Sequence, residues 1–202
     1  MKSMRDISAA LVAIALAVTP VLAQDAPQQQ PAKRQGPQVI KTFGGWDVRC
    51  FAASTQAPCD IWEAIAFKKG GALAVSVSVV YVPSQDRHLM QLIVPLGVDF
   101  AKGAKLIAGS YTSDMIPYHH CDRIGCYFGI GNANPVVDAI RAQSSLKVRV
   151  SQYRGKSIDL NVPVKGFDEA HAMMVEQAKQ KAGKPSASAP EAPAAPDNSS
   201  NP

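Results

Sequence analysis

The chain has 202 residues, of which 47% are hydrophobic and 18% are charged, and its formal net charge is +5. Between residues 39 and 183, Lys68-Lys69 is the one adjacent basic pair, whereas a nucleic-acid-binding domain presents a concentrated basic stripe. The composition therefore predicts no nucleic-acid partner, although the mild positive charge is compatible with weak attraction to anionic lipid headgroups or polysaccharide.

The N-terminal segment predicts export. Lys2 and Arg5 precede an almost wholly apolar run at residues 7–18, and Ala23 ends a short stretch of small and aliphatic residues. This pattern is typical of a secretory signal peptide, which we predict at residues 1–23 with cleavage after Ala23. A transmembrane anchor is the alternative, but the run is shorter than the ~20 residues that span a bilayer. No cysteine directly follows the cleavage site, so we expect no lipoprotein, and no later segment predicts a transmembrane span.

Three regions of different composition follow the signal peptide. Residues 24–38 are rich in Gln and Pro, and residues 184–202 in Pro, Ala and Ser, so neither buries enough apolar surface to offset its chain entropy. We predict a disordered leader and a disordered tail; the tail is either a flexible spacer or a semi-rigid extended arm. Residues 39–183, between them, make one domain of ordinary size.

The pattern of the domain is mainly β. Short runs of alternating apolar and polar residues, bounded by Gly, Pro and Asn, are typical of antiparallel strands. Gly70-Gly71 and Arg154-Gly155 separate neighbouring runs and predict hairpin turns. About seven strands indicate a β-sandwich or an open barrel. The runs are residues 46–51, 59–67, 72–82, 88–95, 126–130, 145–152 and 157–164.

Two segments predict short helices. Residues 135–143 follow Asn134 as a cap and place Pro135 at the first helical position, where its missing N–H costs nothing. Residues 167–181 begin with acidic and end with basic side chains, which suits the helix dipole. The spacing of its apolar residues predicts one packing face, made of Phe167, Ala170, Met174 and Ala178.

Four cysteines, Cys50, Cys59, Cys121 and Cys126, predict two disulfides in an oxidising compartment. Of the three possible pairings, the sequential one needs two local loops, each easily closed by a strand-turn-strand geometry. A redox-active pair is the alternative, but neither spacing is Cys-x-x-Cys. A metal site that also used His119 and His120 is a further alternative; adjacent histidines in a strand point to opposite faces, so we predict no metal.

No motif of a known catalytic or cofactor site is present. The chain lacks Gly-x-Ser-x-Gly, a phosphate-binding Gly-x-x-x-x-Gly-Lys loop, His-Glu-x-x-His and a Gly-x-Gly-x-x-Gly that opens a helix. We therefore predict a protein that is not an enzyme and binds no cofactor.

Five spaced motifs occur in one order along the domain: residues 43–50 (FGGWDVRC), Cys59, residues 94–98 (VPLGV), residues 121–126 (CDRIGC) and residues 166–170 (GFDEA). Over residues 39–175 the chain resembles the invasion-associated locus B family of alphaproteobacterial envelope proteins. The resemblance implies a secreted, β-rich domain with paired cysteines, in bacteria that often live on or in host cells. It supplies no catalytic residues, and we expect structural roles for Trp46 and Gly166.

These observations leave three functional hypotheses. The first is an envelope protein that binds a protein or envelope partner, such as the host-cell surface, and contributes to invasion or adhesion. Its binding would need an exposed apolar patch, for which Tyr111, Met115, Ile116 and Tyr118 are candidates, with a core role as the alternative. The second is a general periplasmic structural or chaperone-like factor, and the third is an unrecognised enzyme or ligand carrier. The expected location is the periplasm or the outer-membrane surface.

Overall fold

The computed structural model describes residues 36–182 except 53, 54, 69 and 144. The predicted signal peptide (1–23), most of the predicted leader and the predicted tail (184–202) lie outside the described residues. The described domain runs from a first strand that begins at Gln38, one residue before the predicted domain start, to a helix that ends at Ala182.

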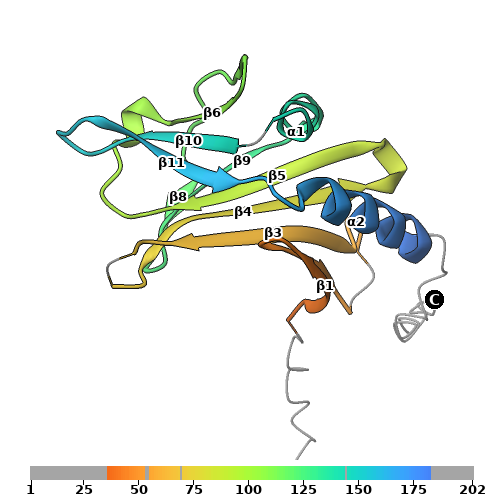
Figure 1. Cartoon of the computed structure of the whole chain (residues 1–202). Helices are drawn as coiled ribbons and strands as arrows, with labels where there is room; N and C mark the ends of the chain where they lie inside the picture. The colour runs from red at the N-terminus through yellow and green to blue at the C-terminus, as the bar shows by residue number, and fades with distance from the viewer. Residues whose placement is uncertain (1–35, 53–54, 69, 144, 183–202) are drawn as a thin grey trace, which may run out of the picture. The chain divides into compact units, whose positions relative to one another are not determined.

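The domain consists of two antiparallel sheets and two helices, so the predicted mainly β class is confirmed. One sheet has seven strands in the order β1-β2-β3-β4-β5-β9-β8, and the other has four in the order β11-β10-β6-β7 (Figure 1). The strands are β1 (Gln38–Phe43), β2 (Trp46–Cys50), β3 (Cys59–Ala66), β4 (Leu73–Val82), β5 (Arg87–Val94), β6 (Ala104–Ala108), β7 (Tyr111–Thr112), β8 (His120–Cys121), β9 (Cys126–Ile130), β10 (Ser145–Ser151) and β11 (Ser157–Pro163).

Alternation along β4 shows how the seven-stranded sheet acquires two different faces. Val75, Val77 and Val79 are buried in the hydrophobic core, whereas Ser76 and Ser78 point to the opposite face, because successive side chains of a strand alternate. The strand register continues these two faces into β3 and β5. One face therefore packs into the core, and the other carries the mixed polar and apolar surface described below.

Both helices pack on the core side of the domain. α1 (Asn134–Arg141) contacts β5 and β6, and α2 (Phe167–Ala182) lies against β1 to β4 (Figure 1). The predicted packing face of α2 is confirmed, because Phe167, Ala170, Met174 and Ala178 are all buried. Two short 3-10 helices, Pro83–Gln85 and Phe100–Lys102, complete the described elements.

Two glycines allow the turn between β1 and β2 to touch the loop that precedes α2. Gly44 and Gly166 both have positive φ, +60° and +86°. A Cβ atom on Gly44 would lie 2.1 Å from the carbonyl oxygen of Lys165, and one on Gly166 would lie 2.3 Å from that of Phe43. A side chain at either position is therefore excluded by both backbone conformation and space.

Trp46 completes this contact. Its indole Nε1 donates a hydrogen bond to the carbonyl oxygen of Pro163 at 3.1 Å, and its ring meets the edge of Phe167 at a centroid distance of 4.9 Å. The fully buried indole thus joins β2 to the end of β11 and the start of α2, which gives Trp46 the structural role that we expected.

The two predicted disulfides are present, between Cys50 and Cys59 and between Cys121 and Cys126. Each joins residues directly opposite one another on neighbouring antiparallel strands, β2 with β3 and β8 with β9. Each disulfide therefore fastens one local pair of strands within the seven-stranded sheet.

Candidate functional site

The four candidate patch residues do not share one exposed surface. Ile116 and Tyr118 are buried in the core, Tyr111 is half-buried in β7, and Met115 is exposed. Paired backbone hydrogen bonds between Ala104 and Ile116 turn the Ile116 side chain inward. Ile116 and Tyr118 therefore belong to the core, which was the alternative to an exposed patch.

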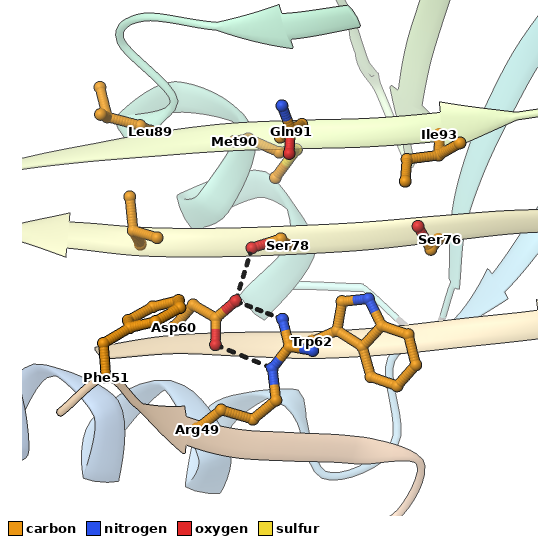
Figure 2. Close-up of a pocket in the computed structure, with 11 residues that line it drawn as sticks. Arg49, Phe51, Asp60, Trp62, Ser76, Ser78, Leu89, Met90, Gln91 and Ile93 are labelled. Atoms are coloured by element: carbon orange, nitrogen blue, oxygen red, sulfur yellow. Dashed lines mark hydrogen bonds and ion pairs between the residues drawn. The ribbon is translucent and has the colours of Figure 1, made fainter. Parts of the chain in front are cut away.

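A groove lies on the outer face of the seven-stranded sheet, opposite the face that enters the core. Its volume is about 480 Å³. The side chains that form it project from β2, β3, β4 and β5 and from the residue that follows β2 (Figure 2). Its lining residues are Arg49, Phe51, Asp60, Trp62, Ser76, Ser78, Val80, Leu89, Met90, Gln91 and Ile93.

An ion pair lies at the centre of the groove. Asp60, only 2% exposed, accepts hydrogen bonds from Arg49 Nε at 3.0 Å and Arg49 Nη2 at 2.5 Å. Ser78 Oγ donates a third, at 2.9 Å (Figure 2). Arg49 and Asp60 meet because they are directly opposite one another in the β2–β3 register. The buried charge is therefore fully paired, which is the condition under which a carboxylate is tolerated away from water.

Apolar and aromatic side chains surround this ion pair. The Arg49 guanidinium lies over the Trp62 ring at 4.6 Å, a cation–π arrangement. Leu89 and Ile93 of β5, both half-buried, line the same groove. The surface thus combines one satisfied polar centre with accessible apolar area.

A second, smaller groove of about 290 Å³ adjoins the first and shares Leu89, Met90 and Gln91 with it. It extends the outer face across β9 to β8, where His120 stacks on Tyr127 at a centroid distance of 4.5 Å. We call the two together the open-face groove. Among the residues that the structure describes, no group of three or more His, Cys, Asp or Glu is placed to hold a metal ion.

Two titratable groups with displaced pKa values lie on the opposite, core-facing side. Burial raises the pKa of Glu63 to about 7, and the negative charge of Asp47 contributes in the same direction. Burial also lowers the pKa of His171 to about 4, assisted by His88 and Arg141. Neither group lines the open-face groove, so neither is placed to act on a molecule bound there.

Comparison with known proteins supplies the family. The sequence model for the family described as "Invasion associated locus B (IalB) protein" matches residues 46–175, more than half of the chain. The chain belongs to this family. The resemblance drawn from the five motifs is confirmed.

A solved structure agrees with this assignment at the level of the fold. The crystal structure of invasion associated protein B from Bartonella henselae is 22% identical in sequence, with a TM-score of 0.60, and the match covers 69% of this chain and 97% of that chain. No curated protein matches the chain.

The motifs that carried the invasion-associated locus B resemblance maintain the fold. In the CDRIGC motif, Asp122 accepts hydrogen bonds from the backbone N–H groups of Ile124 and Gly125 and from the Tyr127 hydroxyl. These hydrogen bonds hold the pKa of Asp122 below its usual value, and the one from the Ile124 N–H has the largest effect. A Cβ atom on Gly125 would lie 2.4 Å from the carbonyl oxygen of Val94 in the VPLGV motif. These two motifs therefore contact one another.

Sequence reasoning missed the open-face groove. Its available signals were Arg49 in a family motif and Trp62, an aromatic residue at an outward position of β3. Both are visible in the sequence, but only the register of four strands brings them together.

In the described part of the chain, no helix combines the length and the apolar character that crossing a bilayer requires.

Proposed function

We propose that this invasion-associated locus B family member is an exported, non-catalytic protein of the bacterial envelope. In this proposal the open-face groove binds a partner protein and thereby contributes to host-cell invasion or adhesion. Membership of a family described by its association with invasion supports the biological role. The two disulfides and the predicted signal peptide support export to an oxidising compartment.

The observation that carries the binding role is the chemistry of the outer sheet face. Trp, Tyr and Arg are the residue types enriched in the energetic centres of protein interfaces, and Arg49, Trp62 and Tyr127 all lie on this face. Around them, Leu89 and Ile93 expose apolar surface that a partner would bury.

The same face supports binding rather than catalysis. The Asp60 carboxylate already accepts three hydrogen bonds, two of them from the Arg49 guanidinium, so it is poorly placed to act as a general base. Ser78 donates to Asp60, and no histidine is among the residues that line the larger of the two pockets, where Ser78 lies, to activate it.

The test uses the protein of residues 24–202, fluorescently labelled, with cultured host cells. Leu89→Asp and Ile93→Asp add charges to the groove, and Met115→Asp and Ile124→Asp add them at exposed apolar positions elsewhere. We expect the groove variants to lose at least about tenfold in cell binding, a loss of about 1.4 kcal/mol, while the controls bind like wild type. Folded groove variants that retain full binding would contradict the proposal.

Protease accessibility on intact and permeabilised bacteria separates direct from indirect roles. Cleavage of the domain on intact cells supports adhesion at the surface. Protection until the outer membrane is opened would instead favour a periplasmic structural or chaperone-like factor, whose effect on invasion is indirect.

A further inference from the structure

Three loops meet at one end of the domain, away from the open-face groove. They connect β3 to β4, β5 to β6, and β10 to β11. Backbone contacts join the last two, because the Tyr153 N–H donates to the Gly97 carbonyl at 2.7 Å and the Asp99 N–H to the Ser151 carbonyl at 2.8 Å. An apolar cavity of about 220 Å³, lined by residues of all three connections and the adjoining strands, lies between them.

Each loop carries a large side chain that is exposed to solvent. Phe67 is 42% exposed, Leu96 57% and Tyr153 64%. Phe67 and Leu96 line the shared cavity, and Tyr153 follows Gln152, which also lines it. Contact between clustered apolar side chains and water is unfavourable. Such a cluster therefore marks a surface that binds a membrane or another molecule.

Basic side chains surround this apolar cluster. Lys68 follows Phe67 directly, and Arg154 and Lys156 follow Tyr153; all three are exposed. The Arg154 guanidinium lies over the Tyr153 ring at 5.2 Å from its centroid. The Arg154 backbone has a φ of 53°, so the β10–β11 connection turns sharply beside Tyr153.

The three connections contain a single acidic residue, Asp99 of the β5–β6 connection. Residues 67–72, 95–98 and 152–156 include no Asp or Glu. The Asp99 carboxylate is already engaged, because it accepts a hydrogen bond from the Ala101 N–H at 3.1 Å and pairs with Lys102 at 3.4 Å. The end of the domain therefore presents an apolar centre within a positively charged rim.

We propose that this end of the domain docks on the surface of an anionic phospholipid bilayer, with Phe67, Leu96 and Tyr153 inserted among the headgroups. The charges favour this occupant, because Lys and Arg beside an apolar insertion attract anionic headgroups. Tyrosine also places an apolar ring and a polar hydroxyl at the membrane–water boundary. This inference goes beyond the proposed partner-binding function and uses none of the groove residues.

Binding is tested with the protein of residues 24–202 and two kinds of vesicle, phosphatidylcholine alone and phosphatidylcholine with about 30% phosphatidylglycerol. We expect co-sedimentation with the anionic vesicles alone, and binding that weakens as salt screens the charges. Failure to bind anionic vesicles, or equal binding to both kinds, would overturn the proposal.

Matched variants locate the contact. Arg154→Gln with Lys156→Gln should lower the partition coefficient about 25-fold, from about fivefold for each basic side chain, and Leu96→Ser with Tyr153→Ser should abolish binding. Lys179→Gln with Lys181→Gln at the end of α2, and Ile124→Ser in the β8–β9 loop, change exposed residues elsewhere and should leave binding unchanged. Loss in the control variants, or retention in folded loop variants, would contradict the assignment.

Insertion has its own readout. Leu96→Trp should show fluorescence that brominated lipids quench more strongly than the fluorescence of the wild-type tryptophans. Bound protein whose new tryptophan is not quenched would refute insertion. The groove variants Leu89→Asp and Ile93→Asp should bind vesicles like wild type, so the two proposals fail independently.

Discussion

Asp60 and Glu63 are two acidic residues of the same strand, and their surroundings give them different properties. Asp60 faces outward beside Arg49 and Ser78, which satisfy its carboxylate. Glu63 faces the core, and its Oε2 atom has no hydrogen-bond partner within the described residues. A buried carboxyl without compensation favours its protonated form, in agreement with its raised pKa.

We predict that Glu63→Gln stabilises the protein at alkaline pH and not at acidic pH. The pKa of Glu63 is about 7 in the folded protein against an ordinary value of 4.5, so the folded state binds the proton more tightly. Its contribution to stability is complete below pH 4.5 and is lost as the pH rises to about 7. At pH 8 the free energy of unfolding, measured in urea, should be about 1–2 kcal/mol higher for the variant than for wild type, and at pH 4 the two should be equal. An equal gain at both pH values would indicate a packing effect instead.

A second prediction concerns the stability that depends on the ion pair of Arg49 and Asp60 in the groove. Arg49→Met removes the partner of a nearly buried carboxylate, and it should lower the free energy of unfolding by about 3 kcal/mol. Arg49→Met combined with Asp60→Leu removes both charges and should recover most of that loss. Denaturant unfolding at neutral pH measures both. A double variant no more stable than the single one would show that the charges are not the cause.

The residue-level contrast was not predictable from the sequence. The segment CDIWEAIAF places the two acids on opposite faces of the strand, but nothing in its pattern shows which of the two carboxylates has a partner. The β2–β3 register places Arg49 opposite Asp60, whereas Glu63 is paired with Val77 in the β3–β4 register. Cross-strand partners, which are remote in sequence, determine which charge is satisfied.

At the level of elements, periodicity predicted the longer strands that bury one face. All seven predicted runs form strands, the two predicted helices form, and hairpins connect β3 to β4 and β10 to β11 as expected. Four strands were missed. β1 is exposed along most of its length, β7 and β8 have two residues each, and β6 has five. β1, β7 and β8 carry little hydrophobic alternation, and pairing with a neighbour determines their conformation. β6 does alternate between buried and more exposed residues, but over only five positions.

The contact between the β1–β2 turn and the start of α2 should depend on glycine. Gly166→Ala adds a Cβ atom 2.3 Å from the Phe43 carbonyl at a φ of +86°, and it should destabilise the protein by about 3 kcal/mol or more. Gly71→Ala is the matched control, because its φ is +64° but open space surrounds it. It should cost about 1 kcal/mol. Thermal unfolding of both variants separates the steric contribution from the conformational one, and equal losses would contradict the close contact.

At the scale of the whole molecule, two histidines connect parts that are distant in sequence. His171 of α2 and His88 of β5 share a hydrogen bond between their Nε2 atoms at 2.9 Å. The Nδ1–H of His88 donates to Asn134 Oδ1 at 2.8 Å, so His88 Nε2 is left to accept from His171. The chain of hydrogen bonds therefore joins both helices to the seven-stranded sheet.

We predict that this connection weakens in acid. Because burial, His88 and Arg141 depress the pKa of His171 to about 4 from 6.5, the unfolded chain binds the proton more tightly. The stability from this group is complete above pH 6.5 and is lost as the pH falls to about 4. His171→Gln keeps an N–H donor but does not titrate. The free energy of unfolding should therefore fall between pH 7.5 and pH 4.5 by about 2 kcal/mol less in this variant than in wild type. An unchanged pH profile would contradict this role.

The disulfides have a consequence for biosynthesis. Cys50 joins Cys59 and Cys121 joins Cys126, so each cysteine is bonded to its nearest neighbour in chain order. An oxidant that couples cysteines successively, as the polypeptide emerges from a translocation channel, would produce the native connectivity directly. If the chain is exported as proposed, we expect its maturation to need thiol oxidation but no reshuffling of mispaired bonds.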